Sequence, residues 1–257
     1  MDNWLKRNIT SPVINTVGKR IEKRNFTKPP VLLGGCGRSG TTLLLSIISA
    51  HPKIYAFPHE VDAFTDWIRR PDGSLEPKRI DRMYRYLIQK RVPGEVHRWC
   101  EKRPFNVRYI PQILEYHGEG TKFIHIVRDA RAVCTSKHPE NPGEYWVSIE
   151  RWKNDVSQGL KFIDHDQVLT IKYENLITNT EQVILEICDF IQEDPVEQIL
   201  NWYEHATVRQ NRAWFGGVTD IQKASLSKWK KAGNAERVDE IMQDKKVVSL
   251  MKQLEYI

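Results

Sequence analysis

A glycine-rich stretch near the N-terminus, GGCGRSGTT (34–42), combines backbone freedom with a cation and several hydroxyl groups. Three chemistries fit this combination. Gly35, Gly37 and Gly40 spell the G-x-G-x-x-G pattern of dinucleotide sites. Residues 35–42 nearly match the G-x-x-x-x-G-K-T pattern of nucleotide P-loops, with Thr41 in place of the lysine. The third interpretation takes the unit RSGTT (38–42) as an anion site in its own right.

A second group of residues that could bind an anion lies in VRDARAVCTS (127–136). Arg128 ends an apolar run, and Ser136 follows eight residues later, two turns into the helix expected from Ala130. A guanidinium fork and a hydroxyl together form a phosphate clamp. The alternative is that Arg128 only pairs with Asp129 or another acid, while Ser136 packs as an ordinary helix residue. Two anion sites at neighbouring strand ends favour a ligand with two separated phosphate-type groups.

The residues around the first loop place it between a strand and a helix. Residues 31–33 form a short aliphatic run bounded by prolines and glycines, which predicts a buried strand. Residues 41–50 are rich in Leu and Ile and end before Pro52, which predicts a helix. Such a loop directs backbone N–H groups and the helix dipole at one point, which favours an anion. A glycine turn with a purely structural role is the alternative.

The second group of residues separates the three interpretations of the loop. The dinucleotide interpretation needs an acid about 20 residues after the glycines, and Glu60 and Asp62 stand near that distance. It leaves Arg38 unexplained. The nucleotide P-loop interpretation lacks its lysine, although Asp129 could serve as a magnesium ligand. Neither accounts for a second cationic site, so the third interpretation is preferred.

The rest of the chain alternates strand and helix patterns. Strands are expected at 122–127 and 168–173, and helices at 81–90, 107–116, 144–163, 180–191 and 196–205. This alternation predicts an α/β fold in a single domain: a P-loop-like parallel β-sheet flanked by helices on both faces. Ligands bind at the carboxyl ends of the strands in such a sheet. Gly35, Arg128 and Tyr173 fall there.

Length and composition are those of a folded globular protein. The 257 residues are 40% hydrophobic and include eight Trp and nine Tyr, enough for a sizeable core. The 39 basic and 33 acidic residues give a formal net charge of +6, which suits an anionic ligand. The basic residues form no stripe or recognised module, so no nucleic-acid partner is expected. The polar, glycine-containing residues 211–224 predict a linker.

The cysteines and the N-terminus bear on the cellular compartment. The cysteines are widely spaced and form no C-x-x-C pair, which predicts neither a zinc site nor a disulfide framework. The N-terminus, MDNWLKRNITS, lacks the apolar stretch of an export signal, and no apolar run is long enough to cross a bilayer. We therefore expect no transmembrane segment, a cytoplasmic location, and reduced thiols at Cys36, Cys100, Cys134 and Cys188.

Taken in order, these motifs resemble those of the sulfotransferases that use 3′-phosphoadenosine 5′-phosphosulfate (PAPS). The similar segments are RSGTT (38–42), AHP (50–52), EKRPF (101–105), VRDARAV with the later Ser136, KYENL (172–176) and SLSKW (225–229). The branch that includes tyrosylprotein sulfotransferases and many bacterial sulfotransferases is the most similar. The resemblance runs from about Pro30 to the C-terminus. It implies a sulfotransferase domain at 30–257, preceded by an N-terminal extension at 1–29.

The resemblance also implies which residues hold PAPS. The 5′-phosphosulfate would lie on the first loop, and Arg128 and Ser136 would hold the 3′-phosphate. Tyr173 resembles a tyrosine that lines the nucleotide site. Ser225 and Lys228 lie in a segment similar to the late loop that closes over the cofactor. The implied cofactor-binding residues of the first loop are Gly37, Arg38, Ser39, Gly40, Thr41 and Thr42.

Transfer of a sulfuryl group to a hydroxyl needs a base and positive charge at the reaction centre. The segment FPHE (57–60) matches the place where the family has its base. Glu60 is the expected base, and His59, one position earlier, is the alternative. Lys102 resembles a lysine that stabilises the transferring group, and Arg38 would act beside it. PAPS has no γ-phosphate that needs magnesium, so no metal is expected.

Two other functions stay open at this stage. A divergent P-loop nucleotide kinase would need ATP and magnesium, whereas a non-catalytic nucleotide-binding module would bind without turnover. The cytosolic small-molecule and steroid sulfotransferases have a lysine where Arg38 stands and a histidine base farther along. That difference argues against phenol and steroid acceptors. The expected partner is a hydroxyl-bearing saccharide, lipid, peptide or metabolite, and the sequence does not identify it or the oligomeric state.

Overall fold

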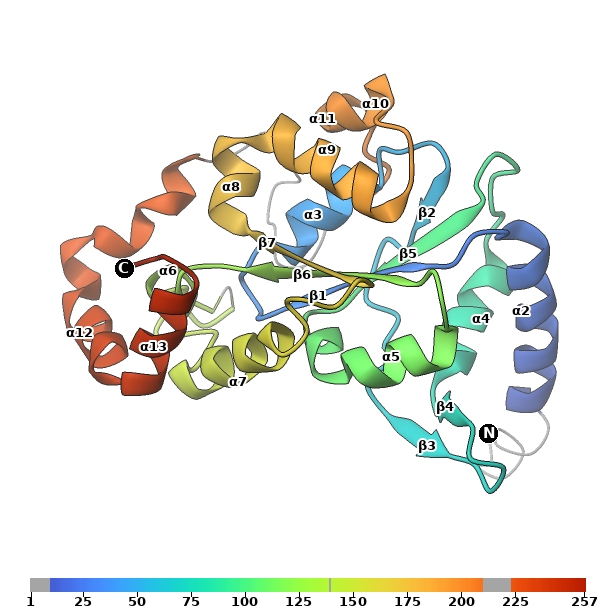
Figure 1. Cartoon of the computed structure of the whole chain (residues 1–257), viewed down its shortest axis with the longest axis horizontal. Coiled ribbons are helices and arrows are strands. Elements are labelled where there is room, and N and C mark those ends of the chain that lie inside the picture. The colour runs from blue at the N-terminus through green and yellow to red at the C-terminus, as the bar shows by residue number, and fades with distance from the viewer. Residues whose placement is uncertain (1–9, 139, 210–222) are drawn as a thin grey trace.

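The computed structural model describes residues 10–138, 140–209 and 223–257. A five-stranded sheet lies at its centre, and all neighbouring strands run parallel. Because all the strands run in the same direction, their carboxyl ends lie at one edge of the sheet. The strand β1 (Val31–Gly35) pairs with a strand on each side and is buried at every position. In order across the sheet the strands are β2 (Ile54–Ala56), β5 (Arg98–Lys102), β1 (Val31–Gly35), β6 (Lys122–Val127) and β7 (Val168–Lys172) (Figure 1).

Helices cover both faces of the sheet (Figure 1). One face carries the aliphatic sides of α3 (Thr41–Ile48), α8 (Tyr173–Thr178), α9 (Thr180–Ile191), α10 (Glu197–Leu200) and α11 (Trp202–His205). The opposite face carries α5 (Ile110–His117), which follows the 3₁₀ helix η2 (Pro104–Tyr109), and α7 (Ile149–Leu160). The apolar residues of the sheet are thus buried on both sides, as a parallel sheet requires.

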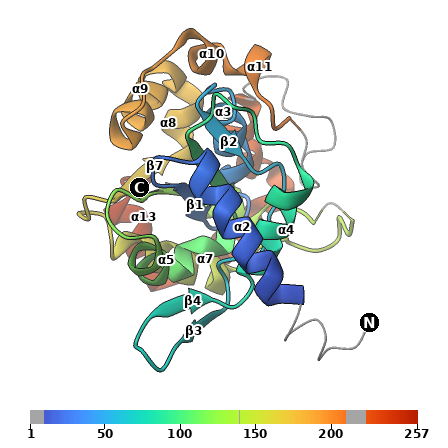
Figure 2. The same cartoon turned by 90° about the vertical axis from the view of Figure 1, so that its right-hand side faces the viewer.

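Further helices close the two ends of the sheet. The helices α2 (Ser11–Asn25) and α4 (Ile80–Gln89) lie side by side at one end (Figure 2), above the hairpin of β3 (Trp67–Arg69) and β4 (Leu75–Pro77). Glu22 of α2 accepts hydrogen bonds from Tyr84 of α4 and Trp99 of β5, each 3.0 Å long. The other end carries α6 (Ala130–Cys134), α12 (Ala235–Gln243), α13 (Lys245–Gln253) and the 3₁₀ helices η3 (Lys223–Leu226), η4 (Lys228–Lys230) and η5 (Ala232–Asn234).

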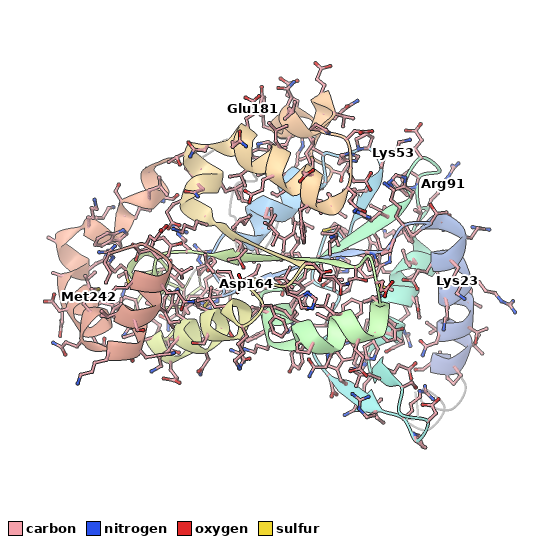
Figure 3. All side chains as sticks on the ribbon, in the orientation of Figure 1. Lys23, Lys53, Arg91, Asp164, Glu181 and Met242 are labelled. Carbon is pink, nitrogen blue, oxygen red and sulfur yellow. The ribbon has the colours of Figure 1, made fainter. Side chains whose placement is uncertain are left out.

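Charged side chains lie around the whole periphery. Figure 3 labels Lys23 on α2 and Glu181 on α9, which point outward at widely separated places. No helix within the three described ranges is both long enough and apolar enough to span a membrane.

The predicted α/β fold and most of its predicted elements are confirmed. The strand at 122–127 and the helix at 180–191 have the expected bounds, and β1, α3, α4 and β7 differ from expectation by one or a few residues at their ends. All four cysteines are free and buried. The predicted linker at 211–224 lies almost entirely outside the described residues.

The long helix expected over 144–163 is wrong in its first part. The helix α7 begins only at Ile149, after Ser148, whose side chain caps it by accepting a hydrogen bond from a backbone N–H of the first turn at 3.1 Å. The preceding residues are held in a loop, because Trp146 N donates to the carbonyl of Ser136 at 2.9 Å. Trp146 therefore lies outside the helix to which the pattern assigned it.

Two other predicted helices are interrupted. The span 107–116 divides into η2 and α5, because Pro111 near the start of α5 favours a new helix there. The span 196–205 divides into α10 and α11 at Asn201, whose φ of −98° and ψ of 40° are not helical. The sequence analysis also missed α2, β2, β5, the β3–β4 hairpin, α8, α12 and α13.

A buried histidine is expected to make the fold sensitive to acid. His125 lies within β6, completely buried, and burial lowers its pKa to about 4. An unfolded histidine has a pKa of about 6.5, so the unfolded chain binds one more proton between these values, and acid favours unfolding. Between about pH 6 and pH 4, this one group should lower the free energy of unfolding by up to about 1.4 kcal/mol per pH unit. His117 is half-buried, and desolvation lowers its pKa to about 3, so it acts in the same direction.

Urea unfolding at pH 5.0, 5.5 and 6.0 measures that slope. His125→Gln removes the titrating group and should flatten the slope by about one proton. The control His205→Gln changes an exposed histidine and should leave the slope as it is. An unchanged slope in His125→Gln would show that another group causes the acid sensitivity.

Candidate active site

The loop after β1 has a backbone suited to an anion. Arg38 has a φ of 68° and Gly40 a φ of 98°, so both lie in the left-handed region and turn the chain sharply into α3. Within this turn Ser39 N donates to Cys36 O at 3.2 Å. The N-cap residue of α3 is Gly40, so no cap side chain covers the N–H groups that its first turn presents. Ser39 Oγ is buried and has no hydrogen-bond partner among the described residues.

The loop lies against an aromatic ring from the end of β7. A Cβ atom placed on Gly40 would lie 2.3 Å from Cδ2 of Tyr173, much closer than two carbon atoms can approach. Tyr173 is the residue directly after β7, and it is buried. The Tyr173 ring therefore packs directly against Gly40, and only a residue without a Cβ leaves room for the ring.

Gly40→Ala should therefore destabilise the protein. The added methyl group meets the Tyr173 ring in a backbone conformation that costs a non-glycine residue about 1–2 kcal/mol, and overpacking adds about 1–3 kcal/mol. Urea unfolding should show a loss of about 2–5 kcal/mol in the free energy of unfolding. The matched control is Gly94→Ala, because a Cβ there meets nothing within 4 Å. Equal stability of the two variants would mean that Tyr173 moves aside without cost.

Two arginines meet beside the loop. Arg128, directly after β6, donates to the carbonyl of Arg38 at 3.1 Å and to the carbonyl of Ser225 at 2.8 Å. Its guanidinium carbon lies 4.0 Å from the centre of the Tyr173 ring. Its Nε is buried and makes no hydrogen bond within the described part of the chain. Burial and the charge of Arg128 lower the pKa of Arg38, which is still a cation at neutral pH. This end of the sheet therefore holds two crowded positive charges.

The late segment of the chain reaches this place through Ser225. Its hydroxyl lies 2.8 Å from the Tyr173 hydroxyl, and its side chain is buried. Lys228, in η4, is exposed. The structure thus brings Ser225 together with Arg128 and Tyr173, whereas the role of Lys228 stays a prediction.

Ser136 differs from its expected setting. The helix α6 ends at Cys134, so the expectation that Ser136 lies two turns into a helix is wrong. Its Oγ donates to the carbonyl of Ala132 at 2.9 Å, and the residue is half-buried. Its predicted contact with a 3′-phosphate is not tested by this arrangement and stays a prediction.

The other predicted catalytic residues meet at the end of β5. Lys102 is the last residue of that strand, and its side chain is only 2% exposed. Its Nζ donates to Oε1 of Glu60 at 2.7 Å, while the Glu60 side chain is 38% exposed. Lys102 is paired in register with Leu33 of β1, the strand that leads into the anion loop. An accessible carboxylate is thus anchored on a buried cation next to the loop.

Two charged residues next to Lys102 in the chain, Arg103 and Glu101, surround the Glu60–Lys102 pair. Arg103 forms an ion pair with Asp62, so a second pair fixes the segment after β2 to the end of β5. Glu101 is completely buried, accepts a hydrogen bond from Asn106 at 2.7 Å, and has its pKa raised by burial to about 7. His59, the alternative base, is exposed and lies edge-on to the ring of Tyr86, 4.9 Å between centres.

Two contacts of the loop were not predicted from the sequence. The guanidinium carbon of Arg38 lies 4.9 Å from the centre of the Trp146 ring. Arg151 of α7 lies beneath the loop, with a terminal nitrogen 3.0 Å from where a Cβ of Gly37 would be, and it pairs with buried Asp155 at 3.4 Å. The four-residue spacing of Arg151 and Asp155 on one helix was a signal for such a pair. Trp146 gave no signal, because its pattern matched an apolar helix face.

Comparison with known proteins identifies related sequences. A family model described as "Sulfotransferase family" matches residues 29–198. A putative protein-tyrosine sulfotransferase of Caenorhabditis briggsae is 27% identical over 196 residues, which are 68% of this chain and 69% of the relative. The protein-tyrosine sulfotransferase of Drosophila melanogaster is 23% identical over 201 residues, 67% of this chain but only 40% of the relative.

Solved structures share the fold over nearly the whole chain. The sulfotransferase domain of the Synechococcus PCC 7002 olefin synthase has a TM-score of 0.63 and 21% identity, and the match covers 91% of this chain and 96% of the domain. Mouse sulfotransferase SULT7A1, complexed with PAP, has a TM-score of 0.56 and 15% identity, with 95% and 94% covered. At these identities the structures establish the fold.

Proposed function

The chain belongs to the sulfotransferase family, and from that premise we propose that it transfers the sulfuryl group of PAPS to a hydroxyl group of an acceptor. The observation that carries the proposal is the pair of cationic sites, Arg38 on the loop and Arg128 at the next strand end, with the Glu60–Lys102 pair beside them. The family match and the PAP bound by the mouse relative support it.

The residues of the site fit a ligand with two anionic groups. Ser39 Oγ and Arg128 Nε are buried polar atoms without hydrogen-bond partners among the described residues, and a ligand could satisfy both. The start of α3 offers N–H groups and a favourable dipole to one phosphate. We therefore propose that residues 37–42 hold the 5′-phosphosulfate. The 3′-phosphate is assigned to Arg128 and Ser136, with Tyr173, Ser225 and Lys228 around the nucleotide.

In the proposed mechanism the protein supplies a base, positive charge and position. PAPS, when bound, provides the sulfuryl group. Glu60 takes the proton of the acceptor hydroxyl through Oε2, since Oε1 already accepts a hydrogen bond from Lys102. Lys102 and Arg38 are cations held where negative charge develops during the transfer, which lowers the barrier. These cations serve where a kinase would use magnesium, so the proposal includes no metal. It also includes a cytoplasmic location, which the four buried free thiols support.

The experiment that tests the proposed function is a comparison of two nucleotides. Adenosine 3′,5′-bisphosphate, the product left after PAPS gives up its sulfuryl group, should bind more tightly than 5′-AMP because only it occupies the Arg128 site. Isothermal titration should show a preference that Arg128→Ala largely abolishes. A charge-assisted hydrogen bond contributes about 1.5–3 kcal/mol, so the expected loss of affinity for the bisphosphate is about 10- to 150-fold.

The control variant is Arg69→Ala, an exposed arginine on β3 paired with Glu115, which should keep the full preference. Equal binding of the two nucleotides by the unmodified protein would contradict the assignment of Arg128. Binding of ATP or NAD without binding of the bisphosphate would contradict the sulfotransferase proposal itself. Bisphosphate binding without turnover on any acceptor hydroxyl would favour a non-catalytic nucleotide-binding protein.

A further inference from the structure

Trp146 lies in the loop between α6, the helix that follows Arg128, and α7. Its backbone N–H donates to Ser136 O at 2.9 Å, and an isolated antiparallel bridge links Lys137 with Tyr145 just before it. Its side chain is half-buried and packs against the apolar cluster that includes Cys36 of the loop and Trp152 of α7. The position of the indole is thus fixed by backbone and core contacts that do not involve Arg38.

Arg38, in contrast, is a cation in an unfavourable setting. Its backbone is left-handed, with a φ of 68°, which fixes the direction in which its side chain leaves the loop. Burial removes water from the guanidinium, and the nearby Arg128 repels it; both effects lower the pKa of Arg38. An arginine side chain has many rotamers, and holding it in one of them costs conformational entropy. A contact that stabilises the charged form in one orientation would offset these costs.

The indole provides such a contact. The guanidinium carbon of Arg38 lies 4.9 Å from the centre of the Trp146 ring, within the range of a cation–π interaction, and tryptophan is the strongest partner for it. Arg128 has an equivalent support, since its guanidinium carbon lies 4.0 Å from the centre of the Tyr173 ring. Each of the two repelling cations therefore has its own aromatic ring, contributed by a separate segment of the chain.

We infer that Trp146 is a positioning residue that holds the Arg38 guanidinium in place for the transferring group, an inference that rests on the proposed function. Trp146 acts through Arg38. By fixing the guanidinium before the ligand arrives, the ring removes the need to order this side chain on binding. Arg38 then contributes more both to nucleotide affinity and to stabilisation of the developing charge.

The test is a double-mutant cycle in which the affinity for adenosine 3′,5′-bisphosphate is measured by isothermal titration. Trp146→Leu should weaken binding about tenfold, or 1.4 kcal/mol. In the Arg38→Ala background the same substitution should change affinity less than twofold, because the group it positions is gone. The free energy of unfolding, measured for the same four proteins, should show coupling between the two residues in the absence of nucleotide.

Two further variants separate positioning from a general loss of structure. Trp146→Phe keeps an aromatic face, so its affinity for the bisphosphate should lie within about threefold of that of the unmodified protein. Trp146→Leu has no aromatic face and should bind more weakly than Trp146→Phe. Trp67→Leu makes the same change at another half-buried tryptophan, in the β3–β4 hairpin, and should leave the affinity unchanged. With PAPS and an acceptor, Trp146→Leu should lower kcat as well as raise the KM for PAPS.

The outcomes distinguish this inference from the proposed function. If Trp146→Leu weakens binding equally with and without Arg38, its role is structural and the inference is wrong, while the function stands. The same conclusion follows if Trp146→Phe binds as poorly as Trp146→Leu. If the unmodified protein does not bind the bisphosphate at all, the proposed function fails, and the inference fails with it.

Discussion

Glu60→Gln is expected to reduce turnover with PAPS and a hydroxyl acceptor by about 10²- to 10⁴-fold, the usual effect of removing a general base. The substitution keeps the size of the side chain, and its amide oxygen can still accept the hydrogen bond from Lys102. The amide cannot take a proton from the acceptor. Affinity for adenosine 3′,5′-bisphosphate should hardly change, because Glu60 is assigned to the acceptor side of the site. Initial rates and isothermal titration provide the two measurements.

The Glu60→Gln variant needs a stability control because the partner of Glu60 is the buried cation Lys102. Its side chain is almost fully buried, so a neutral partner leaves a buried charge less well compensated and lowers the free energy of unfolding. The 38% exposure of Glu60 limits that loss, because water screens the pair. His59→Asn is the matched variant one residue earlier, and it should be mild in rate, affinity and stability. If His59→Asn abolishes turnover while Glu60→Gln is nearly normal, the base is the imidazole.

Arg38→Ala should impair both turnover and nucleotide binding, unlike Glu60→Gln. The guanidinium is assigned to the phosphosulfate before and during the transfer, so its loss weakens both the bound state and the transition state. Removal of one charge-stabilising donor typically lowers kcat by about 10²- to 10³-fold. Affinity for the bisphosphate should fall by about tenfold or more. Steady-state kinetics and isothermal titration on the same preparation separate the two effects.

Arg38→Lys provides the matched comparison. A lysine keeps the positive charge and loses the planar fork, so intermediate values of kcat and affinity are expected. Arg38→Ala also relieves the repulsion between Arg38 and Arg128. Its free energy of unfolding should therefore fall by less than the loss of the other Arg38 contacts alone would cause. Near-normal turnover in Arg38→Ala would exclude this side chain from the reaction centre.

The parts of the site that come directly after a strand in the chain could be predicted from the sequence. The loop after β1, Arg128 after β6 and Tyr173 after β7 could be located because short apolar stretches mark those strands clearly. The sulfotransferase resemblance was confirmed by the family match. It also named Glu60 and Lys102, which the structure brings within 2.7 Å of each other.

The strand that carries Lys102 could not be found from its own residues. Its sequence, RWCEK (98–102), has charges at three of five positions, yet all five residues are buried. Two of those charges are compensated by residues far away in the chain, Arg98 by Glu193 and Lys102 by Glu60, and Glu101 accepts a hydrogen bond from nearby Asn106. A strand stabilised by distant partners has no local hydrophobic pattern.

Trp146 illustrates the opposite error. The spacing of Trp146, Ile149 and Trp152 suits a helix face, and Ile149 and Trp152 do belong to α7. Ser148 caps the helix after Trp146, and the tertiary bond to Ser136 holds Trp146 outside it. Periodicity cannot show where a helix begins when the first apolar residue of the pattern packs on a different element.

The apolar layer beneath the anion loop also determines when the site can form during synthesis. Cys36 of the loop packs in one cluster with Ile241 of α12 and with Val247, Leu250 and Met251 of α13. Synthesis proceeds at about 5–20 residues per second, so the loop leaves the ribosome well before α12 and α13, which follow it in the chain and cover its underside. Until then the nascent sheet exposes part of its apolar surface at the edge to which the nucleotide is assigned. We therefore expect the proposed nucleotide site to form only after α12 and α13 have emerged, and a chain stalled before α12 to expose the apolar surface that chaperones bind.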